Sequence, residues 1–192
     1  SSLSNKSFSY ITSPPPGGFL QATIEGENAI LESVMMGLND NKKTKLICEL
    51  FCGSGTITLP LLKKPYQIHA FELDNESIKS LDIAARKESF GNRVKTKVRD
   101  LKNFPLTSDE LSKYDAIIVD PPRSGAKLQF LNIARSNVLI IISISCNVNT
   151  FVQDAKILVE SNYELKWVQP IDQFLFSAHV ELVAIFHLKY KN

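Results

Sequence analysis

The sequence predicts an α/β fold built on a seven-stranded, mostly parallel sheet with an antiparallel last strand and helices on both faces. Short apolar runs alternate with helical stretches along the chain, and this alternation is typical of parallel strands joined by crossover helices. Several runs are almost continuous in Ile and Val, as expected for strands that are covered on both faces. The last two runs have no helical pattern between them, so we expect an antiparallel pair at one side of the sheet.

Each element follows from this pattern in chain order. Gly26–Asn39 is expected to be helical because its apolar residues recur at helical spacing, and the turn-forming segment Ser13–Gly18 precedes it. The expected strands are Lys45–Phe51, Gln67–Leu73, Arg93–Arg99, Tyr114–Asp120, Asn137–Ser145, Glu164–Gln169 and His179–Lys189. The other expected helices are Thr56–Lys64, Asn75–Phe90, Lys127–Arg135 and Thr150–Asn162.

Composition excludes several classes of protein. The 192 residues are 44% hydrophobic and 22% charged, an ordinary globular composition that is neither disordered nor fibrous. A formal net charge of +2 does not by itself indicate a nucleic-acid-binding protein. The longest apolar run, Val138–Ile142, is too short to cross a membrane. The three cysteines include no Cys-x-x-Cys pair, so we expect no metal site, no disulfide framework and a cytoplasmic location.

The ends of the expected strands carry the unusual residues. In an open parallel sheet, ligands bind beyond the carboxyl ends of the strands. Gly53 and Gly55 follow the first strand, where glycines permit a tight turn and close approach of a ligand, although an ordinary strand–helix turn also explains them. Thr58 occupies the position of the third glycine in the dinucleotide fingerprint. This argues against a pyrophosphate and favours a nucleoside cofactor without phosphates.

Acidic residues end the next three strands. Glu72 follows the glycines by about 20 residues, where a carboxylate grips ribose hydroxyls, and Asp74 is expected to cap the following helix. Asp100 ends the third strand and is a candidate for the adenine amino group. Asp120 ends the fourth strand, and the two prolines after it fix its backbone. A single acid at a strand end is usually a cap, but three beside a Gly-x-Gly favour cofactor binding.

In this order, Gly-x-Gly, a ribose acid and Asp-Pro-Pro resemble the Rossmann-like S-adenosylmethionine-dependent methyltransferases. Arg123 follows the prolines where an aromatic residue would indicate methylation of an exocyclic base nitrogen. Five segments further resemble the RNA 5-methyluridine methyltransferases, and together they span nearly the whole chain. They are Gly18–Thr23, Glu49–Leu59, Asp120–Gly125, Ser145–Asn147 followed by Thr150, and Asp172–Glu181.

The resemblance implies S-adenosylmethionine-dependent transfer of a methyl group to carbon 5 of a uridine in tRNA or rRNA. It implies Cys146 as the nucleophile that adds to carbon 6 of the base, and Glu181 as the base that removes the carbon-5 proton. A helix N-terminus near Thr150 would lower the pKa of the Cys146 thiol. The cofactor-binding residues that we expect are Gln21, Phe51, Gly53, Gly55, Thr56, Glu72 and Asp120 by resemblance, with Asp100 added from its strand position.

The same resemblance makes residues 41–192 the catalytic domain and residues 1–40 a lead-in with one helix that carries the Phe-x-Gln segment. The family usually has N-terminal RNA-binding modules, which we expect to be missing from this chain. Thr23, Val148 and Leu175 replace an asparagine and two prolines of the family motifs. With Val148 in place of proline, the loop that carries Cys146 is expected to be looser.

Recognition of RNA would need an exposed or flipped uridine. Arg93, Lys95, Lys97 and Arg99 alternate along one strand and project from one face, where they either track a phosphate backbone or protect a sheet edge from aggregation. Two alternatives remain for the function. One is a methyltransferase that acts on another base such as cytosine, and the other is a non-catalytic cofactor-binding RNA-interaction module.

Overall fold

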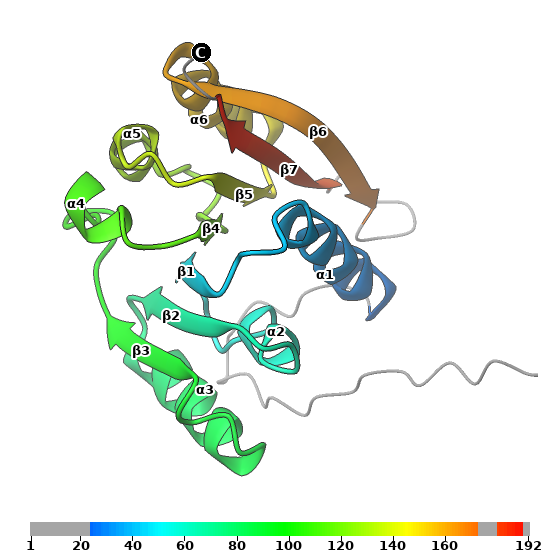
Figure 1. Cartoon of the computed structure of the whole chain (residues 1–192), viewed down its shortest axis with the longest axis vertical. Coiled ribbons are helices and arrows are strands. Elements are labelled where there is room, and N and C mark those ends of the chain that lie inside the picture. The colour runs from blue at the N-terminus through cyan, green and yellow to red at the C-terminus, as the bar shows by residue number, and fades with distance from the viewer. Residues whose placement is uncertain (1–23, 173–179, 190–192) are drawn as a thin grey trace, which may run out of the picture.

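The computed structural model describes residues 24–172 and 180–189, which form a single mixed sheet with helices on both faces (Figure 1). The sheet has the strand order β3-β2-β1-β4-β5-β7-β6. The strands are β1 (Leu46–Leu50), β2 (Gln67–Glu72), β3 (Val94–Val98), β4 (Ala116–Val119), β5 (Ile140–Ser145), β6 (Tyr163–Asp172) and β7 (Val180–Leu188). All neighbouring pairs from β3 to β5 are parallel, and β7 runs antiparallel to both β5 and β6. The predicted fold class is confirmed.

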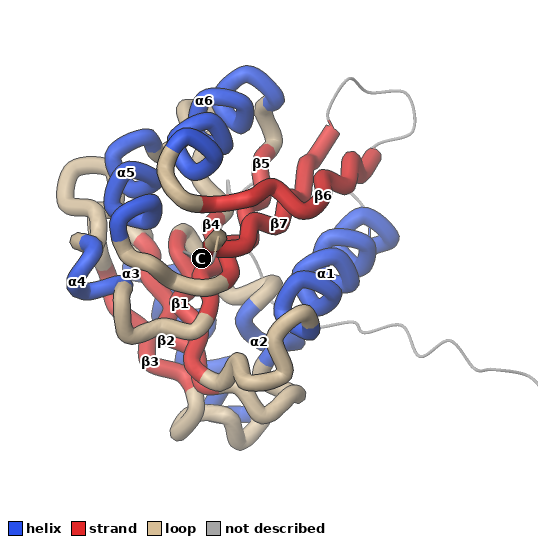
Figure 2. Tube along the Cα trace, turned by 45° about the horizontal axis from the view of Figure 1, so that its top comes forward, coloured by secondary structure: helices blue, strands red, loops and turns tan. Residues whose placement is uncertain are grey.

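Six helices cover the sheet in the part of the chain that the structure describes. They are α1 (Ile24–Asn39), α2 (Thr58–Leu61), α3 (Asn75–Lys87), α4 (Ser108–Leu111), α5 (Lys127–Arg135) and α6 (Val148–Glu160). Figure 2 shows α4, α5 and α6 on one side of the strands and α1 with α2 on the other. Two separate hydrophobic clusters match this division, since α1, α2 and α3 contribute to one cluster and α4, α5 and α6 to the other.

Helix α1 packs against one face of the sheet. Its residues Ile30, Val34 and Leu38 are buried in the same cluster as Ile142 of β5 and Ile185 of β7. At Gly37 an added Cβ would lie 2.4 Å from Ile185 Cδ1, so a glycine is needed there for the helix to approach β7. The division of the chain at residue 40 stays a prediction. No helix among residues 24–172 and 180–189 is long and apolar enough to cross a membrane.

The expected elements differ from the observed ones mainly at their ends. Helix α6 begins at Val148, two residues before the predicted start, and α4 was not predicted. A four-residue helix is too short to show a helical period, and α4 is identified instead by its capping box between Thr107 and Glu110. The predicted antiparallel strand β7 lies between β5 and β6, so β6 forms the edge of the sheet.

This topology brings the predicted site residues to one edge. The parallel strands β1, β2, β4 and β5 all end there, and the antiparallel strand β7 begins there. Ser145, the last residue of β5, pairs with Leu182 of β7. Cys146 and Glu181 are the next residues outward on these two neighbouring strands.

Candidate active site

The loop after β1 is held open by two glycines with different roles. Phe51, Gly53 and Gly55 have φ angles of 64°, 52° and 90°, a left-handed conformation that non-glycine residues rarely adopt. An added Cβ at Gly55 would lie 2.4 Å from Leu81 Cδ1 of α3, whereas one at Gly53 would have no heavy atom within 4 Å. Gly55 therefore lets α3 pack against the loop, and Gly53 leaves open space at the edge of the sheet.

Glu72 fixes the glycine loop to the end of β2. Its carboxylate accepts hydrogen bonds from the backbone N–H groups of Gly53 (3.0 Å), Leu73 (2.6 Å) and Asp74 (3.1 Å). The two oxygens have about four acceptor positions, so one remains for a ligand hydroxyl. Asp74 caps α3 as predicted, because its side chain accepts from the backbone N–H of Ser77.

Glu49 is a buried acid that the sequence reasoning did not select as a site residue. It lies in β1 with 2% of its surface exposed, and Thr58 Oγ1 donates to its Oε2 over 2.6 Å. Burial is the main reason that the pKa of Glu49 is raised to about 8; the Thr58 hydrogen bond lowers the pKa, and the charge of Asp120 raises it. Thr58, at the position of the missing third glycine, therefore partners this acid.

Asp120 shares its surroundings with two other carboxylates. Burial raises its pKa to about 7, and the charges of Glu181 and Glu72 act in the same direction. Its backbone N–H donates to the oxygen of Leu50 over 3.2 Å, which ties the end of β4 to the start of the glycine loop. The carboxylates at the ends of β2 and β4 and the start of β7 thus form one acidic edge that disfavours further negative charge.

Cys146 is the one cysteine of the three that is not buried. Burial raises the pKa of its thiol, the charges of Glu181 and Asp120 raise it further, and Arg123 opposes them. Burial also raises the pKa of Glu181. Desolvation and two carboxylates thus raise the pKa of this thiol above its ordinary value. That the N-terminus of α6, which begins at Val148, lowers the pKa of the thiol stays a prediction.

The cysteine loop is tied to the Asp-Pro-Pro-Arg loop by hydrogen bonds. The Asn147 side chain caps α6 by accepting from the backbone N–H of Asn149 over 3.0 Å, and its Nδ2 donates to the Arg123 oxygen over 3.1 Å. Thr150 Oγ1 lies 3.3 Å from the same oxygen. Val148 is the first residue of α6 and is exposed. These contacts, rather than a proline, hold the loop.

Asp154 supports the same loop from within α6. It is 4% exposed, burial raises its pKa, and its Oδ2 accepts from the backbone N–H of Ala126 over 3.2 Å. A Cβ at Gly125 would lie 3.0 Å from that Oδ2 and 3.2 Å from Thr150 Cβ, and Gly125 has a φ of 73°. The close packing of the loop on α6 therefore requires glycine at this position.

The remaining predicted site residues lie in different surroundings. The Asp100 carboxylate accepts from the backbone N–H groups of Lys102 and Asn103, both at 3.1 Å, and from Asn103 Nδ2 at 2.7 Å. These hydrogen bonds lower its pKa, and they cap its own turn. Thr56 is exposed, and Phe51 is partly buried beside the second hydrophobic cluster. Gln21 lies outside the described residues.

The site as a whole fits a cationic nucleoside cofactor. There is open space beside Gly53, and hydrogen bonds hold the Glu72 carboxylate next to it. The pKa values of Glu49 and Asp120 are raised, so a positive charge at this edge would stabilise their ionised forms. Within residues 24–172 and 180–189, no group of three or more His, Cys, Asp or Glu side chains is arranged to hold a metal ion.

Comparison with known proteins gives a consistent result. Residues 2–189 match the model of the family described as tRNA (uracil-5-)-methyltransferase. An uncharacterised RNA methyltransferase of Agrobacterium fabrum is 44% identical over 173 residues, which are 90% of this chain and 41% of the relative. One of Mesorhizobium japonicum is 44% identical over 171 residues, 89% of this chain and 40% of the relative. This chain therefore spans about 40% of the length of these curated relatives.

Solved structures show the same fold. The tRNA (uracil-54, C5)-methyltransferase of Pyrococcus abyssi, in complex with S-adenosyl-L-homocysteine, has a TM-score of 0.76 at 23% identity and covers 89% of this chain and 40% of that one. The magnesium protoporphyrin IX methyltransferase of Synechocystis, with bound S-adenosylmethionine, has a TM-score of 0.68 at 14% identity and covers 90% and 86%.

Proposed function

Because the chain belongs to the tRNA (uracil-5-)-methyltransferase family, we propose that it transfers a methyl group from S-adenosylmethionine to carbon 5 of a uridine in RNA through a covalent adduct with Cys146. The observation that carries this proposal is the position of Cys146. It is the cysteine left partly exposed, it follows the last residue of β5, and it lies at the same edge as Glu181 and Asp120, whose charges act on its thiol. A structural cysteine would lie in the core, as Cys48 and Cys52 do.

The residues at this edge have the chemistry that the reaction needs. The Cys146 thiolate adds to carbon 6 of the uracil ring, and the electron pair of the 5,6 double bond moves toward carbon 5 and the carbonyl at carbon 4. S-adenosylmethionine, when bound, supplies a methyl group on a sulfonium, which carbon 5 takes up. Glu181 then accepts the proton of carbon 5, the double bond forms again, and the thiolate leaves carbon 6. Burial raises the pKa of Glu181, which makes its carboxylate a stronger base than an exposed one.

Several residues of this chain would hold the cofactor. Glu72 would accept from the ribose hydroxyls through the acceptor position that its backbone contacts leave free. Gly53 would let the backbone approach the cofactor, and Asp120 would lie near the positive charge. Phe51, Gly55, Thr56 and Gln21 complete the set by resemblance, and Asp100 would reach the adenine amino group from the end of β3.

The experiment that tests the covalent mechanism is transfer of a labelled methyl group to total RNA from cells that lack the protein. We expect Cys146→Ala to abolish incorporation while the affinity for S-adenosylmethionine, measured by calorimetry, changes less than threefold. Cys52→Ala is the matched control, because Cys52 is a buried cysteine at the same edge. Incorporation by the Cys146→Ala chain would rule out the covalent route.

A second experiment assigns the base. We expect Glu181→Gln to accumulate a protein–RNA adduct that survives denaturing electrophoresis, because the methylated base cannot lose its carbon-5 proton. Continued methylation without adduct would remove Glu181 from this role. Mass-spectrometric mapping of the product would identify the uridine in tRNA or rRNA, and 5-methylcytidine in its place would support the alternative target. The free cysteines favour a cytoplasmic location for the reaction.

A further inference from the structure

A hollow of about 280 Å³ lies beside β2 and β3, away from the cysteine loop. It opens between these strands and the segment that carries α4 and Tyr114. Helix α4 is a single turn of four residues, whereas α5 and α6, with nine and thirteen residues, pack against each other farther along this face. The short connection leaves the outer strands of this face partly uncovered, and Phe71 and Leu106 line the hollow.

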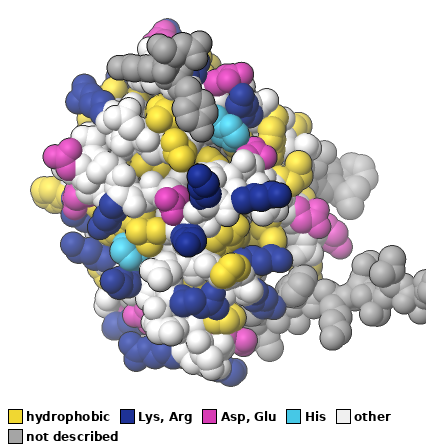
Figure 3. Space-filling model, in the orientation of Figure 1, with side chains coloured by type: hydrophobic (Ala, Val, Ile, Leu, Met, Phe, Trp, Pro, Cys, Tyr) yellow, Lys and Arg dark blue, Asp and Glu magenta, His cyan; other side chains and the backbone are white. Residues whose placement is uncertain are grey.

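Three lysines line the hollow. Lys95 and Lys97 pair with His69 and Phe71 of β2, and side chains at such parallel positions point to the same face of a sheet. The third, Lys113, follows α4, and its Nζ lies 5.1 Å from the centroid of the Tyr114 ring. All three lysines are exposed. In Figure 3, Lys and Arg side chains are spread over the visible face of the molecule, including the side where β3 and α4 lie in Figure 1.

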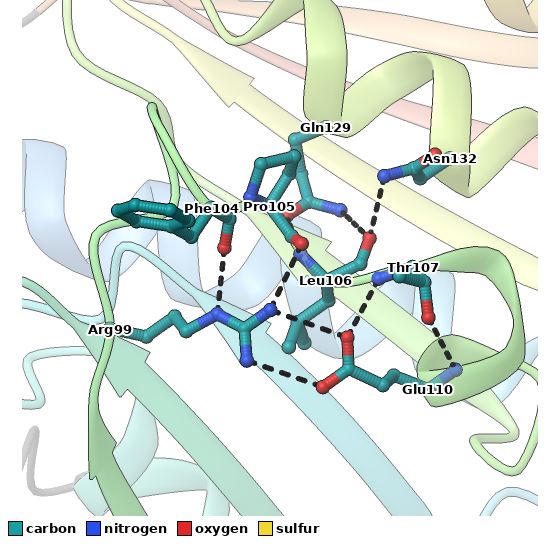
Figure 4. Close-up of polar contacts among 8 residues, drawn as sticks. All are labelled: Arg99, Phe104, Pro105, Leu106, Thr107, Glu110, Gln129 and Asn132. Atoms are coloured by element: carbon teal, nitrogen blue, oxygen red, sulfur yellow. Dashed lines mark hydrogen bonds and ion pairs between the residues drawn. The ribbon is translucent and has the colours of Figure 1, made fainter.

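The positive charge of the hollow is not compensated by its own residues. Glu110 is the one carboxylate among the lining residues, and it already accepts from Arg99 at 3.3 Å and from the backbone N–H of Thr107 at 2.9 Å (Figure 4). Neither Lys95 nor Lys97 forms an ion pair with any residue of the described chain. Besides burial, the charges of Lys113 and Lys95 lower the pKa of His69, so both ammonium groups act on the same imidazole.

The two arginines of the same strand segment have other partners. Arg93 donates to the backbone oxygens of Leu62 and Lys64. Arg99 donates to the backbone oxygens of Phe104 and Pro105 and pairs with Glu110 (Figure 4). The predicted stripe of four basic residues is therefore reduced to its two central lysines, and Lys113, which is distant in sequence, joins them.

We propose that this hollow binds a backbone phosphate of the RNA, several nucleotides away from the base that is methylated. The inference rests on the proposed function and names a second point of contact for its substrate. A neutral surface would remove water from three ammonium groups that have no carboxylate partners, which costs free energy. An anionic occupant is favoured because it would compensate their charge. Strands β3 and β5 are four positions apart in the sheet, or about 19 Å at about 4.8 Å per strand. A strand of RNA whose target base lies at Cys146 would reach the hollow over that distance.

The test is the salt dependence of RNA binding. The variant carries Lys95→Gln, Lys97→Gln and Lys113→Gln, and the matched control carries Lys42→Gln, Lys43→Gln and Lys87→Gln. The control removes the same charge from exposed lysines in the turn before β1 and at the end of α3, which do not line the hollow. The probe is a fluorescein-labelled single-stranded RNA of twenty nucleotides with one central uridine, followed by anisotropy at 50 to 300 mM KCl.

We expect the slope of log affinity against log salt to fall in magnitude by about 0.7 in the variant, the contribution of one lost phosphate contact on a single strand. Affinity at 150 mM salt should fall at least tenfold, and the control should match the wild type. An unchanged slope and affinity in the variant would overturn the proposal, as would absence of binding by the wild type at 50 mM salt. If the lysines govern binding but no methyl group is transferred, the proposed reaction fails and this contact stands.

Discussion

Asn147 links the two loops of the candidate site through a hydrogen bond of 3.1 Å from its Nδ2 to the backbone oxygen of Arg123. The Oδ1 of the same side chain accepts from the backbone N–H of Asn149 and begins α6. One amide therefore sets the start of the helix after Cys146 and its register against the Asp-Pro-Pro-Arg loop. Arg123 and Asp120, the charged residues of that loop, both act on the Cys146 thiol.

Replacing Asn147 should affect both stability and the rate of methyl transfer. Asn147→Ala removes the cap and the bond to Arg123, which together contribute about 1–3 kcal/mol to the free energy of unfolding. We expect the rate of methyl transfer to fall at least tenfold while cofactor affinity stays within threefold. Asn149→Ala, an exposed residue of the same helix turn, is the control for urea unfolding and for single-turnover methylation. Equal effects of the two substitutions would show that Asn147 does not position the loop.

Restoring the proline of the family motif at residue 148 should be tolerated. Val148 is the first residue of α6, where the backbone N–H has no partner within the helix and proline is favoured. Asn147 before it has φ −141° and ψ 111°, an extended conformation that is compatible with a following proline. Val148→Pro should raise the free energy of unfolding by about 0.5–1 kcal/mol and preserve activity. Thermal unfolding measures the first effect, and destabilisation would mean that the valine N–H is needed.

The two glycines of the first loop should respond differently to alanine. Gly55→Ala places a Cβ 2.4 Å from Leu81 Cδ1 at a φ of 90°, so we expect the free energy of unfolding to fall by about 2 kcal/mol or more. Gly53→Ala meets no atom within 4 Å and should cost about 1–2 kcal/mol through its positive φ alone. Its Cβ would instead enter the space proposed for the cofactor. For Gly53→Ala, the loss of binding free energy for S-adenosylmethionine, measured by calorimetry, should therefore exceed the loss in the free energy of unfolding.

Glu49 should make the protein less stable as the pH rises. Its folded pKa of about 8 lies above the ordinary value of 4.5, so between these values the folded state holds a proton that the unfolded state has released. The free energy of unfolding therefore decreases through this window, by at most about 1.4 kcal/mol per pH unit for one group. Asp120, with a pKa of about 7, adds a smaller decrease in the same direction.

Glu49→Gln keeps an acceptor for Thr58 and removes the titration. We expect its free energy of unfolding in urea to be less sensitive to pH between 5 and 9 than that of the wild type, with the largest gain at pH 9. Glu164→Gln, at an exposed position of β6, provides the control. Parallel pH profiles of the wild type and Glu49→Gln would contradict the raised pKa of Glu49.

The strand ends were predictable because their signals are local. Gly53, Glu72 and Asp120 each follow an apolar run, and the parallel sheet brings such ends to one edge. Cys146 and Glu181 were placed by resemblance, since the register that makes them neighbours joins β5 to β7, two strands separated in sequence by α6 and β6. Sequence periodicity does not encode that register.

Contacts across the fold were not predictable from local patterns. The Glu49–Thr58 bond requires that Glu49 point inward from β1, a strand whose other residues are all apolar. The sequence pattern predicts Asp154 to be a polar residue of an amphipathic helix. Only the packing of α6 on Gly125 shows that Asp154 is buried. The stripe on β3 was partly misjudged because the backbone oxygens that bind Arg93 and Arg99 lie in other segments.

The Cys146 thiol should react slowly near neutral pH and respond to its charged neighbours. The thiolate is the reactive form, and burial, Glu181 and Asp120 raise the pKa of this thiol above its ordinary value of 9.0. The rate of alkylation by iodoacetamide should therefore rise with pH to a midpoint above 9. At pH 8, where Asp120 with its pKa of about 7 is mostly ionised, Asp120→Asn should increase the rate severalfold. Arg123→Gln should decrease it, because the arginine charge opposes the shift.

Mass spectrometry of the modified cysteines measures these rates separately. Cys48 and Cys52 are buried and serve as internal controls, since their alkylation in the native protein reports unfolding rather than a change at the site. A midpoint that stays unchanged in both Asp120→Asn and Arg123→Gln would show that neither charge acts on Cys146. Opposite shifts in the two variants would instead show that the Asp-Pro-Pro-Arg loop sets the fraction of thiolate available for addition to the base.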